Sequence, residues 1–225
     1  MPGATVGDMS DHADLDLAAL REEYSTGGLV EDDLASDPIT MFRRWIGEAT
    51  AAGLHEPNAM VVATVSADGR PSARMVLLKG LGERGFVFFT NTSSRKGRDL
   101  AANPACGLLF PWHPLERQVR IDGTATPLPP DEVAAYFSSR PRRSRLGAWA
   151  SHQSQEVAGR DELAESYAAM EERFPGEVPG PEEWGGYVVS ADAVEFWQGR
   201  PGRMHDRLVY RRETGGGWEV VRLAP

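Results

Sequence analysis

The feature that most limits the possible folds is a series of short β-strand patterns that follow one another with few helical segments between them. Five runs of strand type occupy Ala59–Val65, Ala73–Lys79, Phe86–Thr90, Ala105–Phe110 and Gln118–Thr126, and four more occupy Tyr187–Ser190, Val194–Trp197, Leu208–Arg211 and Trp218–Arg222. The turn Asp68-Gly69 between the first two runs favours a hairpin, because these residues readily adopt positive φ. A parallel α/β sheet needs a helix between most strands, so the pattern predicts an antiparallel sheet or barrel.

Helical patterns are few, and we expect them at the periphery of this sheet. Asp37-Pro38 is an N-cap followed by proline at the first helical position, and Gly53 ends that helix. Two later stretches, Pro130–Ser139 and Arg160–Phe174, also have a helical pattern. We find no internal repeat and no clear linker. The sequence therefore predicts one domain over residues 21–225, preceded by a flexible acidic leader over residues 1–20.

Composition and charge argue against several functional classes. The 24 Lys and Arg against 33 Asp and Glu give a net charge of −9, which is unfavourable for a protein whose main partner is a nucleic acid. We see neither a signal peptide nor an apolar stretch near the ~20 residues of a membrane-spanning helix. Cys106 is the only cysteine, which is typical of a reducing compartment, so we predict a cytoplasmic protein. The five histidines lack metal-ligand spacing, and we predict no metal site.

One glycine motif matches a dinucleotide-binding turn in its letters but lies in the wrong context. Residues Gly80–Gly85 read G-x-G-x-x-G. That motif has to open a helix whose N-terminus faces a pyrophosphate, yet the following Phe86–Thr90 has the pattern of a strand. We therefore interpret the motif as a hairpin connection.

A first basic site is predicted around the second strand. Arg74 and Lys79 flank an apolar run, and Arg95-Lys96 follow the turn Asn91–Ser94, which can cap a helix. Basic side chains beside a helix N-terminus can form a phosphate site, although each of these residues alone is also consistent with a solvated surface charge. Arg74 and Lys79 are five residues apart, so we expect them on opposite faces of a regular strand, which indicates two anionic groups.

A second basic site is predicted around Tyr136, Arg140 and Ser144. Tyr136 and Arg140 are spaced i, i+4 on one helical face, and we expect Pro141 to end that helix so that Ser144 folds back. This set suits a phosphate monoester, and the alternative is a solvated basic turn.

A third candidate cluster is Arg203, His205 and Arg207, next to Trp197 in the predicted sheet. His205 is also consistent with a structural histidine in an ion-pair network. The sequence shows no nucleophile elbow, and chemistry in a site without a protein nucleophile is most simply carried by a bound cofactor.

Several segments, in order along the chain, resemble the pyridoxamine 5′-phosphate oxidase family. They are Arg21–Tyr24, Arg74–Lys79, Ser94–Lys96, Phe110–Gln118, Ser139–Pro141, Gln153-Ser154, Phe196–Gly199 and Arg222–Pro225. The resemblance runs from about Leu20 to Pro225. It implies a mainly β fold with peripheral helices, an antiparallel split β-barrel that binds FMN and works as a homodimer with FMN at the subunit interface.

The resemblance also implies roles for individual residues. Arg74, Met75, Val76, Leu77, Leu78 and Lys79 would line the flavin strand, and Phe89, Thr90, Arg95, Lys96 and Gln118 would hold the flavin and its phosphate. Gln153 and Ser154 would reach the flavin phosphate from the partner chain, and Trp197 and Arg207 would complete the site. Lys79, Tyr136, Arg140 and Ser144 would hold the substrate phosphate. Arg203 and His205 would lie over the substrate as candidate catalytic residues, with Arg21 and Tyr24 closing over it as a lid.

The implied reaction is oxidation of pyridoxamine 5′-phosphate or pyridoxine 5′-phosphate to pyridoxal 5′-phosphate in vitamin B6 biosynthesis and salvage. O2 is the electron acceptor, H2O2 is released, and the amine substrate also releases ammonia. Two alternatives stay open. Another split-barrel reductase that uses a flavin or a deazaflavin need not carry the Arg203 and His205 pair, and a non-catalytic carrier would bind flavin or pyridoxal phosphate without turnover.

Overall fold

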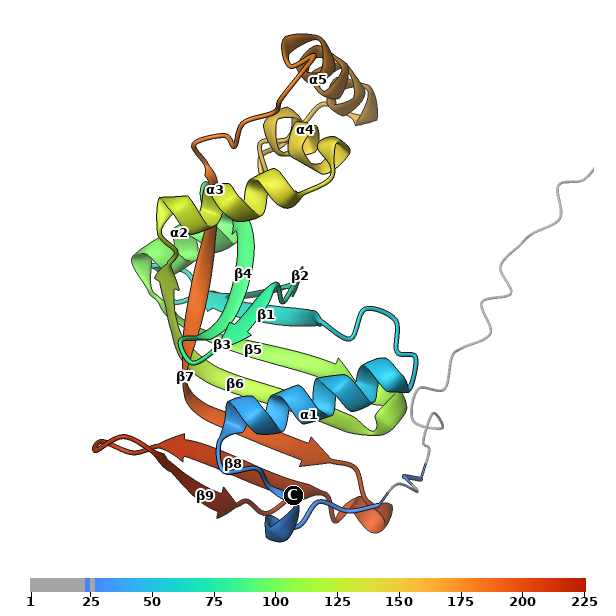
Figure 1. Cartoon of the computed structure of the whole chain (residues 1–225), viewed down its shortest axis with the longest axis vertical. Coiled ribbons are helices and arrows are strands. Elements are labelled where there is room, and N and C mark those ends of the chain that lie inside the picture. Colours follow the sequence, from blue (N-terminus) through green and yellow to red (C-terminus); the bar gives the residue numbers. More distant parts are fainter. Residues whose placement is uncertain (1–22, 25–26) are drawn as a thin grey trace, which may run out of the picture.

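The computed structural model describes residues 23–24 and 27–225, which form a curled β-sheet with helices around it (Figure 1). The expected acidic leader, residues 1–20, lies outside the described residues, and the single domain over residues 21–225 stays a prediction. The strands are β1 (Ala59–Val65), β2 (Pro71–Leu77), β3 (Gly80–Gly82), β4 (Gly85–Asn91), β5 (Ala105–Trp112), β6 (Arg117–Pro127), β7 (Trp184–Gln198), β8 (Asp206–Arg212) and β9 (Trp218–Arg222). The helices are α1 (Pro38–Ala51), α2 (Arg95–Ala102), α3 (Pro130–Ser139), α4 (Arg142–Ala150) and α5 (Arg160–Arg173). Single 3-10 turns occur at Glu31–Asp33, His113–Leu115 and Pro201–Arg203.

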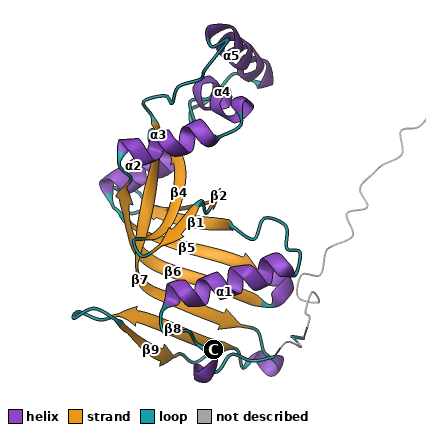
Figure 2. Cartoon of the chain, viewed as in Figure 1, coloured by secondary structure: helices purple, strands orange, loops and turns teal. Residues whose placement is uncertain are grey.

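The strands form one antiparallel sheet that divides at β7. The main path runs β2-β1-β5-β6-β7-β4-β3, and β8 and β9 extend from β7 on a separate branch (Figure 2). The first part of β7, Trp184–Val189, pairs with β4, whereas Ala193–Gln198 pairs with β8. Because β7 exchanges one neighbour for another along its length, the barrel is split rather than closed. The predicted fold class, an antiparallel split barrel with peripheral helices, is confirmed.

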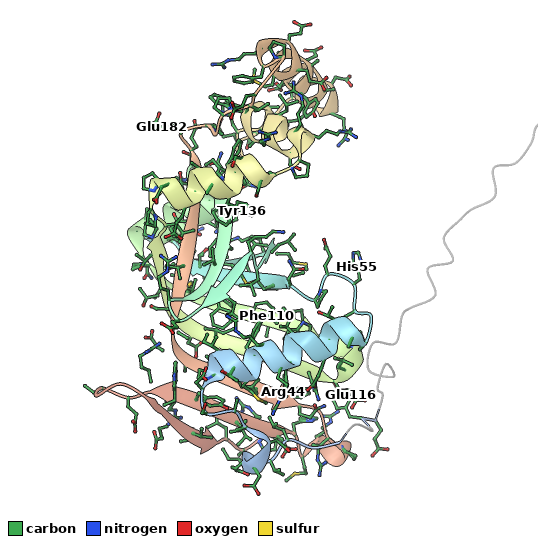
Figure 3. The ribbon with its side chains drawn as sticks, in the orientation of Figure 1. Arg44, His55, Phe110, Glu116, Tyr136 and Glu182 are labelled. Atoms are coloured by element: carbon green, nitrogen blue, oxygen red, sulfur yellow. The ribbon has the colours of Figure 1, made fainter. Side chains whose placement is uncertain are left out.

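Helix α1 covers the core of the sheet (Figure 3). It begins as predicted: the Asp37 carboxylate accepts a hydrogen bond from the Thr40 backbone N–H at 2.9 Å, and Pro38 occupies the first turn. Phe42 is fully buried, and its ring centroid lies 4.7 Å from that of Phe110 on β5. Full burial of a side chain of this size contributes about 1.5–3 kcal/mol, so this contact helps to hold α1 on the sheet.

Two segments differ from the sequence predictions. The two strands expected near residues 187–197 are one strand, β7, because a register shift between Asp122 and Gly123 of β6 lets the paired strands bend without breaking. Gly123 is required there, since a Cβ atom would lie 2.2 Å from the Ser190 carbonyl oxygen. The stretch after Pro141, expected as a turn, is helix α4. It packs with α5 beyond α3, and Figure 1 shows the pair projecting from the barrel.

Cys106 on β5 packs against the edge of the core. Burial raises the pKa of its thiol to about 11, and the nearby Asp192 carboxylate acts in the same direction. No helix within the described ranges has the length and apolar character needed to cross a membrane.

Candidate functional site

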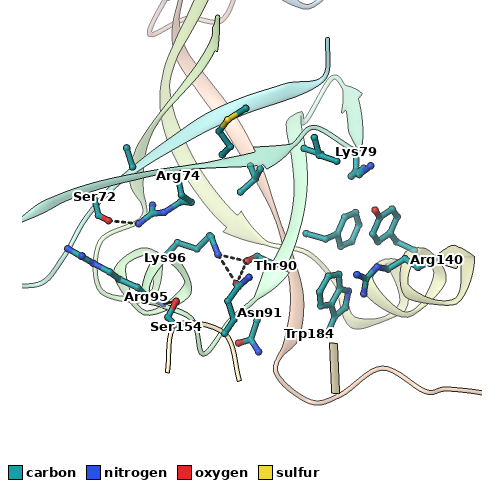
Figure 4. A pocket seen from close by; sticks show the side chains of 17 residues that line it. Ser72, Arg74, Lys79, Thr90, Asn91, Arg95, Lys96, Arg140, Ser154 and Trp184 are labelled. Atoms are coloured by element: carbon teal, nitrogen blue, oxygen red, sulfur yellow. Dashed lines mark hydrogen bonds between the residues drawn. The ribbon is translucent and has the colours of Figure 1, made fainter. Parts of the chain in front are cut away.

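A cleft of about 630 Å3 lies between β2, β4, α2 and α3 (Figure 4). It is lined by Ser72, Ala73, Arg74, Met75, Val76, Leu77, Lys79, Phe89, Thr90, Asn91, Arg95, Lys96, Tyr136, Arg140, Gln153, Ser154 and Trp184. Five of these side chains are cationic and none is a carboxylate. A cleft with this charge balance attracts anions.

Arg74 anchors one end of the cleft. Its guanidinium donates to Thr64 Oγ1 at 2.7 Å, to Ser72 Oγ at 2.8 Å and to the Val62 carbonyl at 3.2 Å. The Asp99 carboxylate lies 3.7 Å away and is itself held by a 2.7 Å hydrogen bond from Thr64. Burial lowers the pKa of Arg74, and the Asp99 charge partly opposes this effect. These contacts fix the guanidinium in place and leave most of its charge for a ligand.

Lys96 lies beside Arg74, and only 7% of its surface is exposed. Its Nζ donates to Thr90 Oγ1 at 2.9 Å, to Ser94 Oγ at 3.2 Å and to Gln153 Oε1 at 2.8 Å. All three acceptors are neutral. Burial, together with the positive charge of Arg74, lowers the pKa of Lys96 to about 8. A buried cation without a carboxylate partner is unfavourable unless a ligand brings the anion.

The start of α2 is built as a cap, as the sequence predicted. The Ser94 hydroxyl accepts from the Gly97 backbone N–H at 3.4 Å. Gly97 allows the helix to approach the preceding turn, because a Cβ atom there would lie 2.0 Å from the Thr92 carbonyl oxygen. The resulting helix N-terminus carries Arg95 and Lys96 into the cleft.

Gln153 and Ser154 reach the cleft of their own chain. Gln153 accepts from Lys96, and Ser154 Oγ accepts from the Arg95 backbone N–H at 3.2 Å. Ser154 has φ 74°, an uncommon conformation for a non-glycine residue that often marks a functional site. The expectation that these two residues come from a partner chain is therefore wrong. The loop after α4 folds back along α2, which the sequence spacing did not indicate.

Tyr136 and Arg140 of α3 occupy the opposite end of the cleft. The Tyr136 ring stacks on Phe89 of β4, with centroids 3.7 Å apart and an interplanar angle of 9°. Arg140 lies over the indole of Trp184 at 4.0 Å. Burial raises the pKa of Tyr136 and lowers that of Arg140. Arg140 Nη1 and Trp184 Nε1 are buried, and neither has a hydrogen-bond partner among the described residues.

Lys79 lines the same cleft as Arg74, so the expectation that they lie on opposite faces of one strand is wrong. Strand β2 ends at Leu77. Leu78 N–H donates to the Asn58 carbonyl at 2.8 Å, and Lys79 N–H donates to the Val87 carbonyl on β4 at 2.8 Å. The chain thus crosses from one side of the barrel to the other at this point, which turns Lys79 toward the cleft. Leu78 is buried in the core and does not line the cleft.

Ser144 does not line the cleft. It lies in the first turn of α4, beside a separate groove between α4 and α5 that Arg143 and Tyr167 also line. Pro141 precedes a new helix here rather than a turn, and the role of Ser144 in binding the substrate phosphate stays a prediction.

The remaining predicted residues form a second cluster away from the cleft, which we call the β6–β8 cluster: Gln118, Trp197, Arg203, His205 and Arg207. Gln118 pairs with Trp197, and Trp197 pairs with Arg207, across three neighbouring strands. The Trp197 and His205 rings are 4.6 Å apart, and Tyr24 packs against both rings at 5.9 and 5.6 Å. Arg21 lies outside the described residues.

Three features of the β6–β8 cluster constrain its residues. Arg207 donates to both oxygens of Glu195, at 2.8 and 3.1 Å, and this pairing raises the pKa of Arg207. His205 Nδ1 accepts from the Arg200 backbone N–H at 3.1 Å. Arg203 has φ 62°, so the loop that carries it is held in an uncommon conformation.

The sequence interpretation did not single out Trp184, Ser72 or Asn91, although all three line the cleft. Trp184 directly precedes Gly185-Gly186 at the start of a strand, and a large aromatic residue before two glycines is a usable signal of close packing. Across the described ranges, no three His, Cys, Asp or Glu side chains are grouped so that they could hold a metal ion.

Comparisons with known families cover most of the chain. The family model described as pyridoxamine 5′-phosphate oxidase matches residues 46–173. A second model, described as the pyridoxine 5′-phosphate oxidase C-terminal dimerisation region, matches residues 184–225. This second region contains Trp197, Arg203, His205 and Arg207, and it supports a homodimer.

Individual relatives agree with the family models. A pyridoxine/pyridoxamine 5′-phosphate oxidase from a Nocardioides species is 68% identical over 211 residues, which cover 94% of this chain and 99% of the relative. The crystal structure of PhzG from Burkholderia lata, in complex with tetrahydrophenazine-1-carboxylic acid, matches with a TM-score of 0.82 and 33% identity over 88% of this chain and 98% of that one. A pyridoxamine 5′-phosphate oxidase-related, FMN binding protein from Nostoc punctiforme shares the fold, with a TM-score of 0.68 and 18% identity over 85% of this chain and 100% of that one. The chain therefore belongs to the pyridoxine/pyridoxamine 5′-phosphate oxidase family.

Proposed function

We propose that the protein is an FMN-dependent oxidase that converts pyridoxamine 5′-phosphate and pyridoxine 5′-phosphate to pyridoxal 5′-phosphate with O2 as the acceptor. The observation that carries this proposal is the pair of cationic ends in one cleft. Arg74, Arg95 and Lys96 lie at one end, and Lys79 and Arg140 lie at the other (Figure 4). Two phosphate monoesters, one on the cofactor and one on the substrate, match two separated cationic ends.

The residues at the first end fit the phosphate of FMN. Lys96 is a buried cation that hydrogen-bonds only neutral groups, and Arg74 is pre-positioned by three hydrogen bonds. A phosphate would supply the negative charge that Lys96 lacks and would also bind Arg74. The residues that would hold FMN are Arg74, Met75, Val76, Leu77, Phe89, Thr90, Arg95, Lys96, Gln153 and Ser154.

The residues at the second end fit the phosphate of the substrate. Lys79 and Arg140 provide charge, and Tyr136 provides a hydroxyl whose ring is fixed by stacking on Phe89. The charge-assisted hydrogen bonds available here contribute about 1.5–3 kcal/mol each. Unphosphorylated pyridoxine should therefore be a poor substrate.

The β6–β8 cluster would complete the site from the partner subunit, with FMN at the interface. Its residues do not line the cleft of their own chain, and all but Gln118 lie in the region that matches the dimerisation model. A twofold dimer interface brings the same two surfaces together twice, so each cleft would receive one such cluster. Tyr24 packs on the cluster and would arrive with it.

The chemistry that FMN supplies when bound is acceptance of a hydride from carbon C4′ of the substrate, with both electrons passed on to O2 to give H2O2. The amine substrate becomes an imine, and water converts the imine to the aldehyde and ammonia. His205 Nδ1 accepts from the Arg200 N–H, which leaves Nε2 as the ring nitrogen that would face the substrate. His205 and Arg203 would orient the substrate and stabilise negative charge during oxidation of C4′. The enzyme has a net charge of −9 and a single cysteine, and on this basis we propose that it is cytoplasmic.

The visible spectrum of the purified holoenzyme without oxygen tests this proposal. Addition of pyridoxamine 5′-phosphate should bleach the flavin absorbance, and admission of O2 should restore it. The double variant Arg203→Ala with His205→Ala should keep the flavin but lose the bleaching. A yellow protein that the substrate does not bleach would favour a reductase or a carrier, and a protein that cannot take up FMN would refute the flavin assignment.

A further inference from the structure

We propose that Trp184 is a specificity-determining residue that gives the cleft its preference for phosphorylated substrates, because its indole holds Arg140 without neutralising it. This inference rests on the proposed function, since it assigns the Arg140 end of the cleft to the substrate phosphate. Trp184 is a positioning residue in this role, acting through Arg140.

The geometry places the guanidinium against aromatic rings only. Arg140 lies 4.0 Å from the centroid of the Trp184 indole and 5.4 Å from that of the Phe137 ring. The two rings pack edge to face, with centroids 5.6 Å apart. Within the described part of the chain, no salt bridge joins Arg140 to a carboxylate. Its guanidinium is therefore held against the two rings by cation–π contacts rather than by an ion pair.

This arrangement differs physically from an ion pair. A carboxylate beside Arg140 would fix the guanidinium but would also compete with an incoming phosphate for its donors. An indole face attracts the cation and restricts its rotation, yet it leaves the positive charge available. The aromatic support therefore suits an arginine that has to bind an anion repeatedly and release it.

Two buried donors at this end point to an acceptor from outside the chain. Arg140 Nη1 and Trp184 Nε1 are both buried without a hydrogen-bond partner among the described residues. Most buried donors in folded proteins are paired, and exceptions gather at functional sites. Both residues line the cleft, so a ligand bound there is one source of the acceptor oxygens that these two atoms lack.

The start of β7 explains how the sequence builds this support. Trp184 pairs with Asn91, and Gly186, two residues later, pairs with Phe89. A Cβ atom at Gly186 would lie 2.7 Å from the Phe89 ring, so glycine is needed for Phe89 to lie flat beneath Tyr136. The segment Trp184–Gly186 thus supports Arg140 and Tyr136 together.

Steady-state kinetics of the holoenzyme test the inference. We compare Trp184→Leu, which removes the aromatic face, with Trp184→Phe, which keeps a smaller one. The matched control is Trp218→Leu, because Trp218 also stacks on an arginine, Arg212 at 4.5 Å, but lies outside the cleft. Loss of a desolvated cation–π contact should lower kcat/KM for pyridoxine 5′-phosphate roughly 10- to 30-fold in Trp184→Leu, mainly through KM.

The deciding readout is the ratio of kcat/KM for pyridoxine 5′-phosphate to kcat/KM for unphosphorylated pyridoxine. This ratio should fall in Trp184→Leu. In Trp184→Phe it should lie between the ratios of the wild type and Trp184→Leu, and in Trp218→Leu it should equal the wild-type ratio. The inhibition constant of inorganic phosphate should rise in parallel with KM. If Trp184→Leu weakens turnover of both substrates equally, or if Trp184→Phe is no better than Leu, the inference is overturned.

A second measurement separates this inference from the proposed function. If wild-type holoenzyme does not oxidise pyridoxine 5′-phosphate, the proposed function fails. In that case, calorimetric titration of the wild-type and variant holoenzymes with inorganic phosphate still measures how tightly the Arg140 end of the cleft binds phosphate. Weaker phosphate binding in Trp184→Leu alone would support the positioning role of Trp184, and equal binding in wild type and both Trp184 variants would refute it.

Discussion

Binding of FMN to the apoprotein should take up a proton at Lys96, and the substitution Lys96→Met should abolish this uptake. Burial lowers the pKa of Lys96 to about 8, so part of the population is neutral in mildly alkaline solution. A phosphate placed beside the Nζ favours the charged form and raises the pKa again. The uptake should therefore be about 0.1 proton at pH 7, about 0.5 at pH 8 and about 0.9 at pH 9.

The lowered pKa of Lys96 also predicts how the stability of the apoprotein depends on pH. The pKa of Lys96 is lower in the folded protein than the value of 10.5 that an unperturbed lysine has. Between these two pKa values the unfolded chain binds more protons at Lys96 than the folded chain does. This residue therefore makes the apoprotein more stable as the pH rises from about 8 to 10.5. Below pH 8 the buried charge costs roughly 3 kcal/mol, at 1.36 kcal/mol per pH unit, and a bound phosphate offsets this cost.

Calorimetry measures the uptake directly. FMN is titrated into apoprotein at pH 8 in two buffers whose ionisation enthalpies differ, and the difference in binding heat gives the number of protons taken up. The phosphate of FMN is already a dianion at this pH, because its second pKa is about 6. Riboflavin, which has no phosphate, is the ligand control and should show no uptake. Equal binding heats in the two buffers for wild type, or the same uptake in Lys96→Met, would refute the reasoning.

Three further predictions concern the dimer, the support of Phe89 and the anchoring of Arg74. If each site needs two subunits, Arg74→Ala and Trp197→Ala homodimers should both be inactive. Joint refolding of the two variants should restore about a quarter of wild-type activity, because about half of the dimers are mixed and one site in each mixed dimer carries neither substitution. No recovery in verified mixed dimers would contradict a shared site. Gly186→Ala places a Cβ atom 2.7 Å from the Phe89 ring, and this overpacking should cost about 1–3 kcal/mol in chemical denaturation and raise KM for the phosphorylated substrate. Asp99→Asn removes the charge 3.7 Å from Arg74 and should lower the apoprotein's free energy of unfolding by about 1–3 kcal/mol, and saturating FMN should reduce this difference; an unchanged unfolding midpoint would show that the pair is not a stabilising contact.

Local signals predicted the elements well where backbone chemistry decides the structure. The Asp37-Pro38 cap and the Asp68-Gly69 turn appear as expected, and Gly80–Gly85 forms a hairpin as predicted, although Gly80–Gly82 is itself a short strand paired with β4. Each depends on residues that lie within a few positions of one another, so the sequence contains the whole cause. The first and last predicted strands, Ala59–Val65 and Trp218–Arg222, match the structure at both ends.

The candidate site was less predictable because it depends on contacts between distant segments. The spacing of Arg74 and Lys79 suggested opposite faces, but the strand ends at Leu77 where the chain crosses to another partner. Gln153 lies 57 residues from Lys96 along the chain, and no local pattern shows that the two side chains meet. The resemblance to a family supplied these residues without their placement, so it assigned Gln153 to the wrong subunit.

The partly buried position of Cys106 has a consequence if the protein generates peroxide, as the proposed function implies. Oxidation of cysteine begins from the thiolate, and with its pKa raised to about 11 only about one thiol in 10,000 is ionised at pH 7. The only sulfhydryl of the chain would thus react slowly with the H2O2 that the proposed reaction releases. Damage during long turnover should therefore appear on thioethers before it appears on this thiol, and Met75 lines the cleft in which the peroxide would form.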